Sequence, residues 1–244
     1  MKTLIIIPSR LSATRLPGKP LLKINGLSII SHVFKKAEQA NIGEVIVATE
    51  DKEILEDVKR NGGQAIITKN THKTGTDRIF EALQKIDSSN IDIIMNLQGD
   101  EPLMNIDDIK NLNNHMVKSQ SELGTLASVI SEKETFENQN IVKVITKENL
   151  NKSNFPFAKN FMRIISNESQ NIYHHLGIYC YQVDTLKKFV SFNQSTNEIK
   201  NNLEQLRALD NNININVGLA ESSPIGVDTE EDFVAIKKIM EYKS

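Results

Sequence analysis

The feature that most constrains this chain is an alternation, over its first 100 residues, between short apolar runs and longer segments of helical periodicity. The apolar runs have the length and composition of buried strands and lie at 3–7, 44–49, 64–68 and 92–98. Helices are predicted at 27–40, 51–63 and 76–85. The first of these places Ile29, Ile30, Val33, Phe34 and Ala37 on one face. This order predicts an α/β protein with a mostly parallel sheet, right-handed crossovers and helices on both faces.

The second half of the chain is less regular. Strands of a mixed sheet or an arm are expected at 125–130, 142–146, 172–183 and 215–220. Amphipathic helices are expected at 203–209 and 228–240. We find no linker or internal repeat, so we expect a single domain over residues 1–244, with a strand-rich region at about 125–185.

Charge and composition exclude several classes of function. The chain has 29 basic and 31 acidic residues, so no large basic field invites nucleic acid or an anionic membrane. A single cysteine, Cys180, excludes an intramolecular disulfide and a thiolate zinc cluster, and we expect it to be a packed side chain. No stretch approaches about 18 apolar residues, and no signal-peptide core follows the start. We expect a soluble, cytoplasmic protein.

A cationic loop follows the first strand. The sequence PSRLSATRLPGKP places Arg10, Arg15 and Lys19 among turn-forming residues before any helix begins. Three neighbouring cations repel one another, so a bound polyanion explains the loop better than scattered surface charge, which is the alternative. The loop lacks the P-loop and dinucleotide-binding signatures. A nucleoside triphosphate is the expected ligand.

Two aspartates are candidates to face that loop. Asp100, in NLQGDEP, comes where the fourth predicted strand ends, and ligands of such sheets bind at the carboxyl ends of the strands. Its alternative role is to cap the following turn. Asp228 precedes the last helix, where its alternative role is to cap that helix. Carboxylates near phosphates repel them unless Mg²⁺ lies between, so the pair predicts a magnesium site.

Two further motifs supply candidate side chains. In HKTGTDR, Arg78 lies in the first turn of a predicted helix, where a cation opposes the helix dipole. We therefore expect a polar partner, which a base, a phosphate or an ion pair would provide. In YHHLGIY the two histidines of a strand point to opposite faces, so at most one faces the site, and we expect that to be His175.

Taken together, these motifs resemble those of the sugar-acid cytidylyltransferases, and most closely the branch that uses 3-deoxy-D-manno-octulosonate (Kdo). The matching stretches span almost the whole chain in order and are IIIPSRLSATRLPGKPL, VIVAT, TGTDR, NLQGDEP, HLGIY, LEQLRAL and VDTEED. The resemblance implies a Rossmann-like nucleotide-diphospho-sugar transferase fold with an arm that forms a homodimer. It implies CTP and a sugar acid as substrates, Mg²⁺ as cofactor, and a place in lipopolysaccharide biosynthesis.

The resemblance also implies roles for individual residues. Nucleotide-binding residues would be Pro8, Ser9, Arg10, Arg15, Lys19, Thr76, Arg78 and Gln98. Catalytic residues would be Lys19, Arg15, Asp100 and Asp228, and the two aspartates would hold the metal ion. Residues on the sugar-acid side would be Gln98, His175, Glu204, Gln205 and Arg163.

The chain departs from the family pattern on the sugar-acid side. Asn154 stands where an arginine is expected, and Asn201 where a glutamate is expected. Arg163 or Lys159 would then replace the missing arginine, or the accepted acid differs. The alternatives are a cytidylyltransferase for 8-amino-Kdo or a nonulosonate, and a non-catalytic nucleotide-binding protein.

Overall fold

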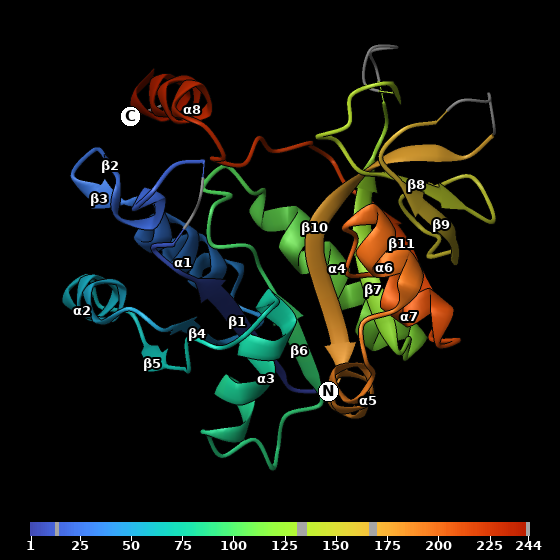
Figure 1. Ribbon diagram of the computed structural model, residues 1–244, viewed down its shortest axis with the longest axis horizontal. Helices are drawn as coiled ribbons and strands as arrows, with labels where there is room; N and C mark the ends of the chain where they lie inside the picture. Colours follow the sequence, from blue (N-terminus) through green and yellow to red (C-terminus); the bar gives the residue numbers. More distant parts are fainter. Residues whose placement is uncertain (13–14, 131–135, 166–169, 243–244) are drawn as a thin grey trace. The chain divides into compact units, whose positions relative to one another are not determined.

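The computed structural model (Figure 1) describes residues 1–12, 15–130, 136–165 and 170–242. Their contacts group into two units. The N-terminal unit comprises Lys2–Ile109 and the returning segment Pro224–Ser244. The central unit comprises Lys110–Ser223 together with Met1.

In the N-terminal unit the four predicted apolar runs form parallel strands. Strand β1 (Thr3–Ser9) pairs with β4 (Gly43–Thr49) on one side and β6 (Ile93–Asn96) on the other, and β5 (Ala65–Ile67) pairs with β4. Ile5 is fully buried and lies in register with Val45 and Met95. Parallel strands that are buried on both faces account for the continuous apolar runs in the sequence.

Helices pack against these strands. They are α1 (Ile29–Ala40), α2 (Lys52–Arg60) and α3 (Gly75–Gln84). The apolar face predicted for α1 is confirmed, since every one of its five residues is at most 3% exposed. The helix begins where the Ser28 side chain accepts a hydrogen bond from Ser31 N, as an N-cap does.

The elements that directly follow the cationic loop pack against the last helix of the chain. They are the 3₁₀ helix η1 (Lys19–Leu21) and the strands β2 (Lys23–Ile24) and β3 (Leu27–Ser28), and the last helix is α8 (Glu230–Tyr242). Ile236 of α8 packs with Ile24, Ile29 and Val227 in one buried cluster. This packing holds the segment that precedes α8 next to the first strands and helices of the unit.

The central unit contains a mixed sheet. Strand β10 (Ile172–Gln182) pairs antiparallel with β7 (Leu123–Ser128) and, at its start, with β8 (Lys143–Thr146). Strand β11 (Ile215–Leu219) is parallel to β7, and β9 (Ala158–Met162) is antiparallel to β8. The mixed sheet expected for the second half is therefore present.

Several elements of the second half differ from the sequence predictions. The helices α4 (Ile106–Ser119), α5 (Val183–Ser191) and α6 (Thr196–Asn201), and the strand β9, were not predicted. The buried face of α4 has helical spacing, but its many polar residues obscured the pattern. The helix predicted at 203–209 is α7 (Leu206–Asp210), which begins three residues later than expected. Within the described residues, no helix is long and apolar enough to cross a bilayer.

Candidate active site

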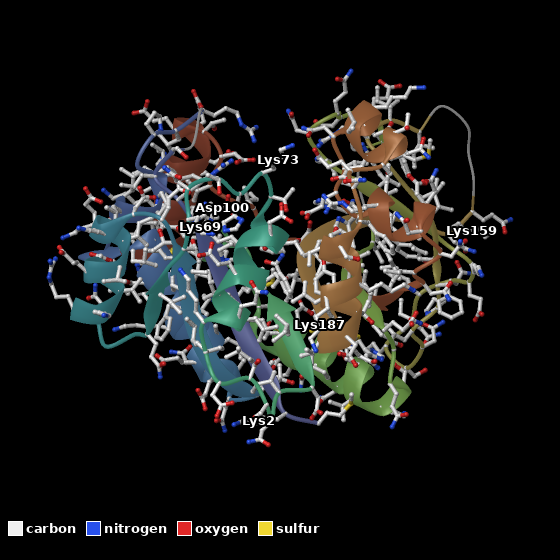
Figure 2. The ribbon with its side chains drawn as sticks, turned by 60° about the horizontal axis from the view of Figure 1, so that its bottom comes forward. Lys2, Lys69, Lys73, Asp100, Lys159 and Lys187 are labelled. Atoms are coloured by element: carbon white, nitrogen blue, oxygen red, sulfur yellow. The ribbon has the colours of Figure 1, made fainter. Side chains whose placement is uncertain are left out.

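A polar pocket of about 330 Å³ opens in the N-terminal unit at the carboxyl ends of its parallel strands. Figure 2 shows Asp100, Lys69 and Lys73 at one end of this unit and Lys2, at the start of β1, at the other. The lining residues come from the end of β1, from the segments after β1, β5 and β6, from the first turn of α3 and from the segment before α8. They are Pro8, Ser9, Arg10, Ser12, Arg15, Lys19, Pro20, His72, Lys73, Thr74, Gly75, Arg78, Gln98, Gly99, Asp100 and Asp228.

Backbone contacts position the cationic loop. The amide of Leu11 donates to the Asp51 carboxylate at 2.8 Å, and the amide of Gly18 donates to Leu11 O at 3.1 Å. Gly18 has a φ of 72°, which glycine adopts without steric cost. Because the loop is tied back at both points, Arg10, Arg15 and Lys19 all line the pocket.

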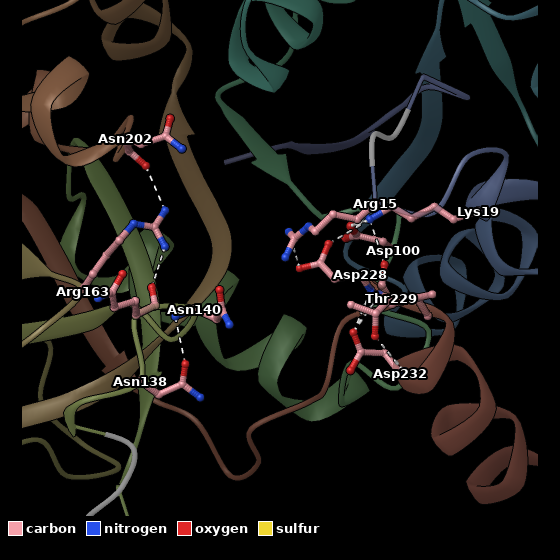
Figure 3. A network of polar contacts seen from close by, with 12 residues as sticks. Arg15, Lys19, Asp100, Asn138, Asn140, Arg163, Asn202, Asp228, Thr229 and Asp232 are labelled. Atoms are coloured by element: carbon pink, nitrogen blue, oxygen red, sulfur yellow. Dashed lines mark hydrogen bonds and ion pairs between the residues drawn. The ribbon is translucent and has the colours of Figure 1, made fainter.

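The ammonium group of Lys19 joins the two predicted aspartates (Figure 3). Its Nζ lies 2.5 Å from Asp100 Oδ2 and 3.2 Å from Asp228 Oδ1, and it also donates to Val227 O at 2.8 Å. Arg15 Nη2 lies 2.9 Å from the second carboxylate oxygen of Asp228. Burial opposes the charge on Lys19, but Asp100 and Asp228 outweigh it, so the pKa of Lys19 is raised.

The side chain of Asp228 does not cap α8. Thr229 Oγ1 accepts a hydrogen bond from Asp232 N, and Asp232 Oδ2 accepts from the amides of Asp228 and Thr229. This reciprocal arrangement satisfies the first turn of the helix (Figure 3). The Asp228 carboxylate is therefore available to the pocket, and the capping alternative for this residue is wrong.

Glu101 brings a third carboxyl group next to the two aspartates. Burial, followed by the charges of Asp100 and Asp228, raises its pKa to about 8, although Lys19 acts in the opposite direction. Its Oε2 atom is buried and has no hydrogen-bond partner among the described residues. The Oγ atom of Ser9, which lines the pocket, is also buried and has no hydrogen-bond partner among the described residues. Asp100 and Asp228, which both contact the ammonium group of Lys19, fit a divalent cation, because such a cation reduces the repulsion between two carboxylates. Glu101 is protonated at pH 7 and adds no charge to this pair.

Arg78 has the polar partner that we expected for a cation in the first turn of α3. Its guanidinium forms an ion pair with Glu50, which directly follows β4, and donates to Thr68 Oγ1 at 2.6 Å. Arg78 is 3% exposed yet lines the pocket. Of the three partners considered from the sequence, the structure contains the ion pair. Thr76 is 1% exposed and is not among the residues that line the pocket.

The predicted sugar-acid residues belong to both units. Gln98 lines the pocket of the N-terminal unit, whereas His175, Glu204, Gln205 and Arg163 belong to the central unit. His175 Nε2 lies 3.0 Å from Thr125 Oγ1. Burial, followed by the charge of His174, lowers the pKa of His175 to about 3, so its ring is neutral at pH 7.

Tyr179 is a neighbour of His175 that the sequence predictions did not include. Its ring centroid is 5.4 Å from that of His175, and burial together with the nearby Tyr181 and Glu204 raises its pKa. Tyr179 belongs to the HLGIY motif but was not selected from the sequence. The available signal was the period of two in a strand, which places Tyr179, four residues after His175, on the same face. A bulge between Leu176 and Tyr179 breaks that regular spacing.

Arg163 is held by backbone carbonyl groups. Its guanidinium donates to Asn201 O, Gln139 O and Asn202 O at 3.0–3.2 Å. Figure 3 shows Arg163 beside Asn202. An arginine has five N–H groups, so donors remain for a further ligand. Cys180 is buried, as expected for a packed side chain, and burial raises its pKa.

Sequence reasoning missed several residues that line the pocket. They are Ser12, Pro20, His72, Lys73, Thr74, Gly75 and Gly99. Four of these belong to the HKTGTDR motif, in which only Thr76 and Arg78 were selected. A Cβ on Gly75 would lie 3.4 Å from Pro8 Cγ, so this turn packs directly on the end of β1. The turn was visible in the sequence, but its neighbour in space was not.

A parallel α/β sheet with a cationic pocket at the carboxyl ends of its strands defines a protein of the nucleotide-binding α/β class. A family model described as cytidylyltransferase matches residues 4–215. The 3-deoxy-manno-octulosonate cytidylyltransferase of Thermodesulfovibrio yellowstonii is 42% identical over 98% of both chains, and that of Bartonella tribocorum is 40% identical over 98% of this chain and 99% of the relative. The chain belongs to the cytidylyltransferase family.

Solved structures agree with this assignment. A CMP:2-keto-3-deoxy-manno-octonic acid synthetase complexed with CTP is 35% identical, with a TM-score of 0.90 over 100% of both chains. A UDP-glucose pyrophosphorylase complexed with UDP-glucose is 15% identical, with a TM-score of 0.74, and shows the fold alone. The predicted nucleotidyltransferase fold is confirmed.

Proposed function

We propose that this chain transfers CMP from CTP to 3-deoxy-D-manno-octulosonate and releases pyrophosphate. The observation that carries the proposal is the convergence of Lys19, Asp100 and Asp228 within 3.2 Å in the pocket, in a chain with relatives of that activity at about 40% identity. The product would serve lipopolysaccharide biosynthesis, as the resemblance implied. The cytoplasmic location and the homodimer expected from the sequence stay predictions.

The reaction that the pocket supports is an in-line displacement. An anomeric hydroxyl oxygen of the sugar acid bonds to the α-phosphorus of CTP, while the bond from that phosphorus to the bridging oxygen breaks. Pyrophosphate leaves with the electron pair, and the hydroxyl proton is released. Charge builds on the phosphoryl oxygens, and cations fixed in advance stabilise it. Arg10, Arg15 and Lys19 are placed to do this, because all three line the pocket.

Asp100 and Asp228 would hold a Mg²⁺ ion. No group of three or more metal-binding side chains occurs among the described residues, but Mg²⁺ in such sites takes one or two carboxylates and completes its shell with phosphate oxygens and water. The ion would supply charge neutralisation on the triphosphate. In the structure Lys19 occupies the space between the two carboxylates, so it keeps them together and shares their charge.

The sugar acid would bind to the residues that were predicted for the sugar-acid side. His175, Glu204 and Gln205 of the central unit, with Gln98, stay the candidates for its hydroxyl and carboxyl groups. Arg163 stays the candidate for the carboxylate, since two of its N–H groups are not used by the three carbonyl oxygens. Neutral His175 would accept or donate a hydrogen bond rather than an ionic contact.

One observation favours a related acid as the alternative acceptor. Asn154, where the family has an arginine, donates to Asn149 O at 2.7 Å and accepts from Asn151 N at 2.9 Å. Its amide closes a local turn and adds no positive charge to the acceptor side. Pyrophosphate release measured with Kdo, 8-amino-Kdo and nonulosonates would rank the acceptors, and the highest kcat/KM identifies the substrate.

The decisive experiment replaces Asp100. Asp100→Asn keeps the size of the side chain and removes one carboxylate, so CTP-dependent pyrophosphate release should fall by at least about a thousandfold while the protein stays folded. Glu230→Gln is the matched control, since it removes an exposed carboxylate two residues from Asp228. Wild-type turnover in Asp100→Asn would contradict the role of this residue, and no turnover in the wild-type protein with any acid would contradict the function.

A further inference from the structure

The loop between β5 and α3 contains a second ion-pair network, separate from Lys19 and the aspartates. Glu81 of α3 is 9% exposed, and its Oε2 accepts from the amide of Lys69 at 2.9 Å and from Nε2 of His72. Its other oxygen, Oε1, lies 2.6 Å from Lys85 Nζ. One buried carboxylate therefore holds both the beginning and the middle of the loop.

The carboxyl group of Glu81 is ionised at neutral pH. Burial alone would raise its pKa, but hydrogen bonds from Lys85, Lys69 and His72 together lower it to about 2. A carboxylate only accepts hydrogen bonds, so Nε2 of His72 must carry the proton that it donates. The contact thereby fixes both the orientation of the ring and the position of its proton.

The same contact leaves Nδ1 as the remaining polar atom of the ring. His72 lines the pocket with a side chain that is 16% exposed. Within the described residues, no hydrogen bond to Nδ1 is formed, and this atom is not among the buried unpaired ones. Nδ1 is therefore accessible to a ligand in the pocket.

Charge indicates which part of a nucleotide this ring suits. Lys85 already balances the charge of the Glu81 carboxylate, and a ring with its proton on Nε2 offers Nδ1 as a hydrogen-bond acceptor, which a phosphate oxygen cannot donate to. The cations Arg15 and Lys19 gather with the aspartates instead. A neutral hydroxyl or amino group is the better partner for Nδ1.

We propose that His72 is a further substrate-binding residue that contacts the nucleoside part of the nucleotide, and that Glu81 is the positioning residue that orients it. The inference rests on the proposed function, because it assumes that the pocket takes CTP. It assigns a role to a motif residue that the phosphate and metal chemistry of the site does not use.

The test uses side chains that separate the two ring nitrogens. Glutamine places its amide near the position of Nε2, so His72→Gln keeps a donor for Glu81 and removes Nδ1. We expect the Kd for CTP, measured by calorimetry with Mg²⁺, and the KM for CTP to rise about tenfold, with kcat within about twofold of wild type. Unchanged Kd and KM would overturn the proposal, as would a fall in kcat alone.

Glu81→Gln tests the positioning role. It should raise the KM for CTP by a similar factor, and the double variant should show no further rise, because both changes act through the same ring. Lys85→Met is the matched control: it removes the other partner of Glu81, so it should lower stability and leave the KM for CTP unchanged. A rise in KM for Lys85→Met equal to that of Glu81→Gln would reduce Glu81 to a structural role and overturn its part of the proposal.

Two measurements complete the design. An effect of His72→Gln that disappears with 2′-deoxy-CTP assigns the contact to the ribose, and one that persists assigns it to another group of the nucleoside. Direct measurement of CTP binding, separate from turnover, distinguishes this proposal from the proposed function. A wild-type protein that binds CTP through His72 but releases no pyrophosphate would end the catalytic assignment alone, whereas normal turnover with unaffected binding in His72→Gln would end only this one.

Discussion

Two pairs of cations, Arg15 with Lys19 in the N-terminal unit and Lys143 with Arg163 in the central unit, are held by different kinds of partner. In the N-terminal unit, Arg15 and Lys19 contact the carboxylates of Asp100 and Asp228. In the central unit, Lys143 is fully buried and donates to Asn138 O at 2.7 Å and to Arg163 O at 2.6 Å, while the guanidinium of Arg163 donates to three backbone carbonyl groups of the described residues.

The difference shows which cations are suited to exchange partners. Arg15 and Asp228 have side chains that are 59% and 47% exposed, so their ion pair is screened and weak, and a polyphosphate can replace the carboxylate. Carbonyl groups around Lys143 fix its position without cancelling its charge, and burial lowers its pKa. The first pair is suited to exchange its carboxylates for an anion, whereas Lys143 connects the segments of its own unit.

The strongest test of this comparison removes one lysine from each pair. Lys19→Met should lower kcat about a thousandfold, because a fixed cation facing the reacting phosphates is lost. Lys143→Met should instead lower the free energy of unfolding by about 2 kcal/mol, since it leaves two buried carbonyl oxygens without a donor, and kcat per folded molecule should change less than threefold. Steady-state kinetics and denaturant titration measure both. Equal losses of kcat in the two variants would contradict the comparison.

A second test concerns ion pairs of different exposure. Arg207 and Glu198 in the central unit have side chains only 3% and 4% exposed and form two bonds of 2.8 and 2.5 Å. Arg207→Met should cost about 3 kcal/mol of stability, because Glu198 is left buried and unpaired. Arg15→Met should cost less than about 1 kcal/mol and raise the KM for CTP. Glu198→Gln added to Arg207→Met should recover part of the loss, and no recovery would contradict this explanation.

The smallest expected effect is a difference between the two units in how much stability they lose in acid. His175 has a folded pKa of about 3, below that of an unfolded histidine, so its contribution is fully present above pH 6.5 and is lost as the pH falls toward 3. From pH 7 to 5 this amounts to roughly 2 kcal/mol. Glu81, with a folded pKa of about 2, contributes above pH 4.5 and loses its contribution only below that value.

We therefore expect acid to loosen the central unit first. Guanidinium titrations between pH 7 and 5 measure the loss, and hydrogen exchange assigns it to a unit. His175→Gln should remove the loss that His175 contributes in this range, and Glu81→Gln should leave the profile unchanged. Glu101, with a folded pKa of about 8, gains stability as the pH falls over the same range, so the contribution of His175 is the difference between the two profiles of the wild-type protein and His175→Gln. Identical profiles for the wild-type protein and His175→Gln would contradict the burial of a neutral His175.

The accuracy of the sequence predictions follows the same division into units. Continuous apolar runs identify strands buried on both faces, so β1, β4, β5 and β6 were predicted within a few residues. Parallel pairing then brings their carboxyl ends to one edge, which is why Arg10, Lys19, Asp100 and Gln98 could be placed in one site. In the central unit, the polar residues of α4 and the direct passage from β10 into α5 hid those helices.

The sequence by itself determined the fold class, the family and the edge of the sheet at which the site lies, because those properties depend on local periodicity and on motifs in order. Only the tertiary structure decided which partner each charged side chain has. It assigned the capping of α8 to Thr229 and Asp232 and so released Asp228, paired Arg78 with Glu50, and placed Glu81 behind His72. Such pairings join residues from separate elements, and hydrogen bonds depend on distances of a few ångströms that no sequence spacing specifies.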